Sequence, residues 1–302
     1  MTPLEDAILR TILYADVFNF ALTLEELHHF LIAATPANVD QIEQAIMRSP
    51  RLQAALVCID GLFMIAGREE LAALRQTREQ ASAALWEAAA RYGRWIGRLP
   101  FVRMVALTGA LAMRNAIAND DIDYVIITTE RRVWLARALT IVIVRLARLR
   151  GVHLCPNYLL AETALRQDRR DLYMAHEIAQ MIPVYGRDLY RRMRLQNAWV
   201  AAHLPNADDS FYSMTVSPEH GHGWRLLKRA GEWLLGGVLG DAFERWERER
   251  KLRRFAPQMQ AERGDAQLDE ARVKGHFQDR GHPALNAYAE RLALYAVVED
   301  VL

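Results

Sequence analysis

The chain has 302 residues, of which 52% are hydrophobic and 25% are charged, and its formal net charge is +1. This is the composition of globular material, and the length is enough for two or three domains. A net charge near zero excludes a global field that would draw the protein to nucleic acid.

Other features of the chain bear on its location. The first residues show no basic region followed by an apolar core, so we expect no signal peptide. The most apolar helical stretch, residues 133–149, carries three arginines, which predicts a buried amphipathic helix and no membrane span. The two cysteines, Cys58 and Cys155, lack metal-binding spacing and suit a reducing compartment. We therefore expect a cytoplasmic protein.

Residues 1–67 are predicted to form a small domain of three helices and a hairpin. Periodicity and caps place the helices at about 4–16, 24–33 and 37–48. Thr23 is the expected cap of the second helix, with Glu26 three residues on. Asp60-Gly61 lies between two apolar runs, which is the strongest short-range hairpin signal. Three helices followed by a hairpin resemble a winged helix-turn-helix.

The charge of this domain argues against DNA binding. Residues 1–67 hold three arginines and eight acids, and the expected third helix has no cation before Arg48. DNA affinity depends on neutralising phosphates with Lys and Arg. We therefore favour a docking module that binds a protein partner or a second copy of the chain. A winged-helix transcriptional regulator is the alternative.

Residues 68–98 are rich in Ala, Glu and Arg and contain no proline. This composition predicts one long linker helix, ending near Gly97. The helix would tie the N-terminal domain to a central domain over residues 99–205.

The chemically most informative stretch opens this central domain. An apolar run at 102–107 breaks at Thr108-Gly109-Ala110, and a second run resumes at 121–127. The pattern predicts two strands joined by a glycine turn and a small helical segment. At Gly109 the missing Cβ lets a phosphate approach the backbone, whose N–H groups can receive its charge.

Two acids lie on the second of these strands. Because side chains alternate along a strand, Asp121 and Asp123 point to the same side, about 7 Å apart. Such carboxylates repel each other unless a cation joins them. A hard divalent ion, Mg²⁺ or Mn²⁺, is the natural occupant of an all-oxygen pair.

A strand, a glycine turn, a short spacer and then acid-apolar-acid on the next strand resemble the nucleotidyltransferase superfamily related to DNA polymerase β. The match consists of Gly109-Ala110 and Asp121-Ile122-Asp123. The resemblance implies a mixed sheet with flanking helices, a metal at the two aspartates and the phosphates of an NTP near the turn. It also implies transfer of a nucleoside monophosphate to an acceptor hydroxyl. The family usually has a serine as the second turn residue, where this chain has Ala110.

The family also usually carries a third carboxylate on a later strand. A strand expected at about 152–160 places His153, Cys155 and Asn157 on one face, and none of these is an acid. Asn157 could offer an oxygen ligand. Glu162 lies just beyond the strand, either reaching into the site or serving as a surface acid at a helix start.

A third acid acts as general base or completes the metal ligands, so an active site without one needs a substitute. The sequence supplies His176-Glu177 on a helix expected at about 171–181. Glu177 is the candidate base and His176 a candidate contact to the nucleotide. Helix capping or core hydrogen bonding is the alternative for both.

Residues 206–302 are predicted to form a helical C-terminal domain. Its helices are expected at about 224–239, 241–255 and 283–298. A polar cluster precedes the last helix and consists of Lys274, His276, Asp279 and Arg280. If this domain packs over the nucleotide site, the cluster contacts the phosphates or the acceptor. The alternative is that these residues are polar surface residues without a function.

The sequence thus predicts an α+β protein with a winged-helix-like N-terminal domain, a polymerase-β-like nucleotidyltransferase core and a helical C-terminal domain. The candidate catalytic residues are Asp121, Asp123, Glu162 and Glu177. The candidate nucleotide-binding residues are Thr108, Gly109, Ala110, Asn157 and His176. The expected activity is metal-dependent nucleotidyl transfer from an NTP to an acceptor that the sequence does not specify. A weakly active or inactive nucleotide-binding scaffold is the alternative.

Overall fold

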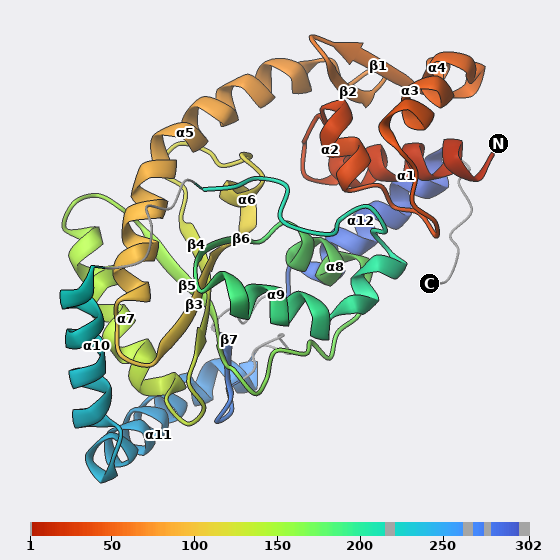
Figure 1. The fold of residues 1–302 in the computed structure, drawn as a ribbon. Coiled ribbons are helices and arrows are strands. Elements are labelled where there is room, and N and C mark those ends of the chain that lie inside the picture. The colour runs from red at the N-terminus through yellow and green to blue at the C-terminus, as the bar shows by residue number, and fades with distance from the viewer. Residues whose placement is uncertain (1, 215–220, 262–267, 275–278, 296–302) are drawn as a thin grey trace.

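The computed structural model of the chain describes residues 2–214, 221–261, 268–274 and 279–295. Within these ranges the protein is an α+β structure with twelve α-helices, a five-stranded mixed sheet and a separate two-stranded hairpin (Figure 1). The predicted α+β class and the mixed sheet are therefore confirmed.

The N-terminal segment forms four helices and the hairpin. These elements are α1 (Pro3–Val17), α2 (Leu24–His29), α3 (Val39–Arg48), α4 (Pro50–Ala55), β1 (Leu56–Ile59) and β2 (Leu62–Ile65). The cap at Thr23 is confirmed, because its hydroxyl accepts a hydrogen bond from Glu26 N and the Glu26 carboxylate accepts one from Thr23 N. Asp60 and Gly61 both have positive φ, 52° and 79°, which confirms the hairpin turn.

Two details of this segment differ from the prediction. Helix α2 ends at His29, earlier than expected, and α4 was not expected at all. Proline restricts the residue before it, so Pro50 ends α3 at Ser49. The same proline begins α4 in the first turn, where its missing N–H is not needed, and the Ser49 hydroxyl accepts from Leu52 N at 3.3 Å.

Helix α5 (Glu70–Gly97) runs from the hairpin to the sheet (Figure 1). A buried ion pair holds α2 against it: Arg75 Nη2 lies 2.8 Å from Glu26 Oε1, and the two side chains are 2% and 0% exposed. The same nitrogen contacts Glu79, one turn further along α5, and the Tyr212 hydroxyl. The N-terminal segment is therefore tied to the linker helix by a desolvated charge network.

The large sheet has the strand order β6-β3-β4-β5-β7. Its strands are β3 (Val102–Leu107), β4 (Ile122–Thr128), β5 (Leu154–Ala161), β6 (Ile182–Tyr185) and β7 (Arg272–Lys274). Strands β4 and β5 are parallel and are connected by α7 (Val133–Arg148), as a parallel pair requires, whereas the other neighbours are antiparallel. The remaining helices are α6 (Gly109–Ala112), α8 (Leu172–Ala179), α9 (Arg187–Gln196), α10 (His222–Leu235), α11 (Val238–Ala261) and α12 (Gly281–Leu294), with a 3₁₀ helix at Ala198–Ala202.

The sequence predicts β3, β4, β5 and α7 within two residues at each end, but not β6 or β7. Both of these are edge strands of the sheet. β6 contains Pro183, which has no N–H for a ladder, and β7 spans three residues with charged ends. Their pairing depends on the rest of the fold and leaves no alternating pattern in the sequence.

The two faces of the sheet are covered by different helices. Tyr124 and Ile126 point to the face that packs on α5 and α7. Val125 and Ile127 point to the opposite face, which packs on α8, α9 and the N-terminal helices. By strand alternation Asp123 belongs with Val125, so the candidate acids lie on this second face.

The C-terminal segment packs against the earlier parts of the chain. β7 pairs with β5, and α12 packs on α1 and α8. α11 packs on α7, where the Glu244 carboxylate accepts hydrogen bonds from Trp134 N and Leu135 N at 2.9 and 2.7 Å. The segment predicted to be helical therefore also supplies a strand of the core sheet.

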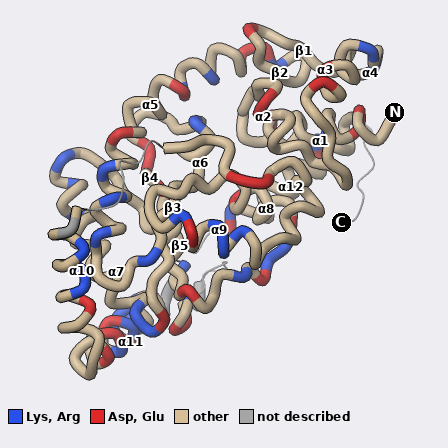
Figure 2. Tube along the Cα trace, in the orientation of Figure 1, with Lys and Arg blue, Asp and Glu red and all other residues tan. Residues whose placement is uncertain are grey.

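Helices α10 and α11 present both apolar and basic side chains at the surface. Trp233 is 85% exposed, and Leu226 and Leu239 are also exposed. Figure 2 shows Lys and Arg along α9, α10 and α11. Over the part of the chain that the structure describes, no helix combines the length and the apolar character that crossing a membrane requires.

Candidate functional site

The glycine turn after β3 lies directly against one of the candidate acids. The Thr108 N–H donates to the Asp123 carbonyl at 3.0 Å, which aligns the end of β3 with the start of β4. Gly109 has φ +69°, and a Cβ on it would stand 2.7 Å from Asp123 Oδ2. Glycine is therefore required here twice, by the backbone conformation and by the carboxylate. The predicted proximity of turn and acid is confirmed.

The two aspartates differ in environment. The Asp121 side chain is 61% exposed, and its Oδ1 lies 3.6 Å from His153 Nδ1. Asp123 is half-buried, and burial raises the pKa of its carboxyl to about 6, with the negative charges of Asp121 and Asp120 adding to the rise. A hydrogen bond from Cys155 and the Arg280 guanidinium act in the opposite direction.

The neighbouring strand puts a thiol where a third acid could have stood. Cys155 is the register partner of Asp123 in the parallel β4–β5 pair. Burial raises the pKa of the Cys155 thiol to about 12, and the Asp123 charge adds to this. At neutral pH the group is therefore a neutral thiol that donates to Asp123, and not a thiolate.

The carboxylates of Asp121 and Asp123 are the side-chain donors that this site offers to a metal such as Mg²⁺. Among the described residues, no group of three or more His, Cys, Asp or Glu side chains is arranged to hold a metal ion. Mg²⁺ is commonly held by one or two carboxylates together with substrate phosphates. The negative charge of Asp121 contributes to the raised pKa of Asp123, and Gly109 has no Cβ to occupy the space beside Asp123 Oδ2. The site therefore suits a metal that arrives with a phosphate ligand.

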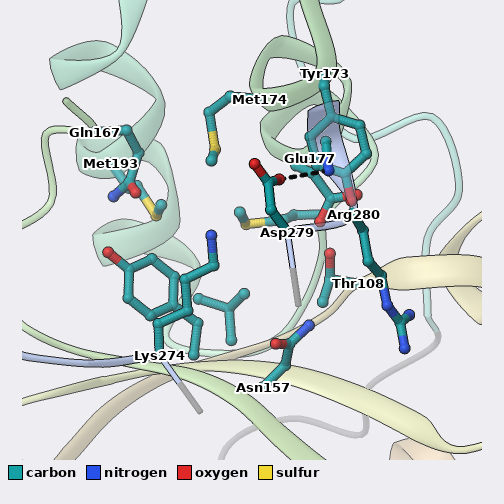
Figure 3. Close-up of a pocket in the computed structure, with 14 residues that line it drawn as sticks. Thr108, Asn157, Gln167, Tyr173, Met174, Glu177, Met193, Lys274, Asp279 and Arg280 are labelled. Atoms are coloured by element: carbon teal, nitrogen blue, oxygen red, sulfur yellow. Dashed lines mark hydrogen bonds between the residues drawn. The ribbon is translucent and has the colours of Figure 1, made fainter. Parts of the chain in front are cut away.

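A small pocket on the same face of the sheet, called here the sheet pocket, gathers polar side chains from distant segments (Figure 3). It has a volume of about 70 Å³. Its polar lining includes Thr108, Asn157, Glu177, Lys274 and Arg280. The Thr108 hydroxyl is buried and has no hydrogen-bond partner within the described structure. An orphaned hydroxyl of this kind is a ready contact for a ligand oxygen.

A β-bulge brings Asn157 into this pocket. Tyr124 pairs with Pro156 and Val125 pairs with Tyr158, so Asn157 is the extra residue of the bulge. Both Asn157 and Tyr158 consequently line the sheet pocket. Asn157 therefore lies in the lining of the sheet pocket through a bulge and not through simple alternation, and its role as an oxygen ligand stays a prediction.

Glu177 enters the sheet pocket from α8, the helix expected at about 171–181, whose N-cap is Asp171. Burial raises the pKa of the Glu177 carboxyl to about 7, and the Asp123 charge adds to the rise. Lys274, a hydrogen bond from Gln180 and Arg280 limit it. Glu177 is thus a carboxyl close to Asp123 that is poised to exchange a proton near neutral pH.

The two other histidine and glutamate candidates are placed differently. His176 stacks on Tyr14 with ring centroids 4.0 Å apart, and its Nδ1 lies 3.0 Å from the Leu172 carbonyl. Burial lowers the pKa of His176 to about 4, so the ring is neutral. Glu162 follows the far end of β5, roughly 20 Å along the strand from Cys155 at ~3.3 Å per residue. The structure does not bring Glu162 to the cluster.

Part of the polar cluster before α12 lies at the sheet pocket. Lys274 and Arg280 line the sheet pocket, and Asp279 accepts hydrogen bonds from Arg169 and from Gly281 N. His276 lies outside the described residues. The sequence shows these residues as a polar group, but only the pairing of β7 with β5 places Lys274 beside Tyr158 in the lining of the sheet pocket.

A second and larger cavity, called here the aromatic pocket, adjoins the glycine turn. Its volume is about 320 Å³. Its aromatic lining comes from the N-terminal segment and from α8: Tyr14, Phe18, Phe20, Phe30, Tyr173 and His176. Gly109 and Ala110 also line this cavity, and Tyr173, Glu177 and Arg280 line both it and the sheet pocket. Sequence reasoning misses this cavity, because its walls are ordinary apolar positions of helices and of the loops beside them until the two segments pack together.

Comparison with known proteins identifies no relative of this chain. The chain matches no protein-family model, no curated protein and no solved structure at the significance required of a match. The functional argument therefore depends on the geometry of the site.

Proposed function

We propose that the chain is a nucleotidyltransferase that binds a nucleoside triphosphate with Mg²⁺ or Mn²⁺ and transfers the nucleotidyl group to an acceptor hydroxyl. The observation that carries this proposal is the contact between the Gly109 turn and the Asp123 carboxylate, with Asp121 beside it. A turn open to phosphate and a carboxylate pair open to a metal lie side by side, and this is the combination that a metal–triphosphate complex needs.

The order of the central elements supports a polymerase-β-like core. Strands β3 and β4 are antiparallel and joined through the glycine turn, and α7 then leads to β5, parallel to β4. The N-terminal helices and hairpin are compatible with a winged-helix-like domain. This domain contributes walls to the aromatic pocket, which supports a role in binding at this site.

In this proposal each side chain has a separate task. Asp121 and Asp123 hold the metal, which neutralises phosphate charge when bound. The backbone at Gly109 and Ala110 and the Thr108 hydroxyl contact the phosphates, and Arg280 and Lys274 supply positive charge in the lining of the sheet pocket. Catalysis by positioning and charge neutralisation suits phosphoryl chemistry, which needs little covalent help from the protein.

Glu177 replaces the missing third acid in this scheme. Its carboxylate accepts the proton of the acceptor hydroxyl, the acceptor oxygen bonds to the α-phosphorus, and the bond from that phosphorus to the bridging oxygen breaks to release pyrophosphate. A pKa near 7 lets Glu177 accept this proton at neutral pH. Its place in the lining of both pockets puts it between the phosphate side and the larger cavity.

The test is calorimetric binding of each of the four ribonucleoside triphosphates with and without Mg²⁺. We expect the Asp121→Asn/Asp123→Asn variant to lose at least tenfold in Mg²⁺-dependent affinity. Asp120→Asn is the matched control, because Asp120 is the adjacent acid and bonds to the backbone of its own turn. Equal affinity in the wild type and the double variant would remove the metal assignment.

A catalytically inactive nucleotide-binding scaffold is the second candidate, and Cys155 beside Asp123 is the observation that favours it. Pyrophosphate release from labelled triphosphates separates the two functions. A transferase releases pyrophosphate when an acceptor is present, and release depends on Asp123 and Glu177. A scaffold binds the triphosphate with the same aspartates and releases none.

A further inference from the structure

The aromatic pocket has walls that are fixed before any ligand binds. Tyr14, Phe20 and Phe30 are 5%, 5% and 3% exposed, so the fold holds them in place. Tyr14 stacks on His176, and its ring lies 5.4 Å from that of Phe18. Phe30 lies parallel to His176 at 6.1 Å. The cavity is therefore preorganised, and a ligand would lose little binding energy to rearrangement.

The size of this cavity matches a compact ring system. Its volume is about 320 Å³. An apolar cavity of about 150 Å³ holds one benzene molecule. The aromatic pocket therefore has room for two fused rings, and its ring-lined walls favour a flat apolar ligand that makes stacked and edge contacts.

Charge is confined to one end of this cavity. Among the described residues that line it, Glu177 and Arg280 carry a charge, and both also line the sheet pocket. The other polar groups of the lining are largely engaged: Gln180 donates to Glu177, and Asn115 accepts from Arg78 and donates to the Phe18 carbonyl. These walls offer no series of charges that could pair with a polycationic or polyanionic ligand. They suit an uncharged ligand that has a single polar group near Glu177.

We propose that the aromatic pocket is the acceptor site, and that the acceptor is a flat, uncharged aromatic compound of about two fused rings with a hydroxyl group on its edge. This inference rests on the function proposed above and names its substrate class. The hydroxyl lies at Glu177, which takes its proton as the oxygen bonds to the α-phosphorus and pyrophosphate leaves. The N-terminal domain then serves to build the acceptor site jointly with α8.

The probe is 2-naphthol, with naphthalene as the analogue that lacks the hydroxyl. Fluorescence titration of the full chain without nucleotide measures occupancy of the cavity. We expect 2-naphthol to bind, and Phe18→Ala to weaken binding at least fivefold. Phe243→Ala, on α11, is the matched control, because Phe18 and Phe243 are 39% and 40% exposed and only Phe18 lines the cavity. Ala15→Leu, which fills the cavity from α1, should weaken binding at least tenfold.

The second measurement is pyrophosphate release from Mg²⁺ and triphosphate. We expect 2-naphthol to raise the rate at least tenfold in the wild type and in Phe243→Ala, and naphthalene to occupy the cavity without raising it. The proposal is overturned if Phe18→Ala and Ala15→Leu, both shown to be folded by circular dichroism, bind 2-naphthol as the wild type does. It is equally overturned if the probe displaces the triphosphate, because the cavity is then the nucleobase site.

The failures of the two proposals are distinguishable. If calorimetry shows no triphosphate binding, the proposed function is contradicted, and the acceptor role of the aromatic pocket is contradicted as well. Normal triphosphate binding, together with 2-naphthol that binds but does not raise pyrophosphate release, leaves nucleotide binding intact and overturns only the acceptor assignment.

Discussion

The Cα of Gly109 and the carboxylate of Asp123 occupy adjoining space, so that a Cβ at position 109 would lie 2.7 Å from Asp123 Oδ2. This distance is below any ordinary carbon–oxygen contact, and it couples the glycine turn to the Asp123 carboxylate. A change at either residue therefore alters the other.

Gly109→Ala tests this coupling. Its φ of +69° costs an alanine about 1 kcal/mol, and displacement of Asp123 adds about 1–3 kcal/mol. Gly151→Ala is the matched control, because Gly151 has φ +72° with nothing within 4 Å of the added Cβ. Urea unfolding should show a larger loss for Gly109→Ala, and calorimetry should show weaker triphosphate binding in that variant alone. Equal losses of stability in the two variants would contradict the contact.

The ion pair between Arg75 and Glu26 should be the strongest polar link between the N-terminal helices and α5. Both side chains are almost fully buried, at 2% and 0% exposed. Glu26→Ala leaves a buried guanidinium with less compensation, and we expect a loss of about 3 kcal/mol in the free energy of unfolding. Glu79→Ala removes the partner of Arg75 that is 44% exposed and should cost less than about 1 kcal/mol. Urea denaturation of the two variants shows whether the contribution of an ion pair to the free energy of unfolding depends on its burial or only on its being formed.

The stability of the protein should fall as the pH rises through neutrality. Burial raises the pKa of Glu177 from 4.5 to about 7, so the folded state holds this proton more tightly than the unfolded chain does. The contribution of the neutral carboxyl is complete below about pH 4.5 and is lost as the pH rises through about 7, by at most about 3 kcal/mol.

Glu177→Gln removes this titration. Unfolding measured at pH 5 and pH 8 should show a smaller pH dependence in this variant than in the wild type, whereas Glu162→Gln, beyond the far end of β5, should behave as the wild type. The rate of the proposed transfer should rise with pH through about 7 in the wild type, since the proposed base, Glu177, acts as the carboxylate. A pH dependence of unfolding that survives in Glu177→Gln would show that another group is responsible.

Local signals account for most of what the sequence could predict. The Thr23 capping box, the Asp60-Gly61 turn and the apolar runs of β3, β4 and β5 each depend on neighbours in the chain. The shared direction of Asp121 and Asp123 stays a prediction, because β4 begins at Ile122 and strand alternation is shown from Ile122 onwards. These features could be predicted because the physics that determines them acts over a few residues.

The parts that escaped prediction depend on contacts between distant segments. β6 and β7 are strands only because β3 and β5 offer them an edge. Glu177 could be named from the sequence as a candidate base, but its raised pKa comes from burial and from the Asp123 charge, which the sequence does not show. Tyr14 and Phe30 look like core residues of small helices until α8 closes the cavity over them. No spacing rule in a single sequence carries that information.

The thiol beside Asp123 allows a direct test of the site. Cys155 is the register partner of Asp123, and Cys155→Asp adds a carboxylate on the neighbouring strand. Without a cation, two close carboxylates repel, so we expect the variant to lose about 1–2 kcal/mol of stability at neutral pH. With millimolar Mg²⁺, the added ligand should recover this loss, and Mg²⁺ should raise the Tm by several degrees more than in the wild type. Cys155→Asn is the control, since it is similar in shape but adds no charge. If Mg²⁺ raises the Tm of the aspartate and asparagine variants equally, then Asp121 and Asp123 do not form a cation site.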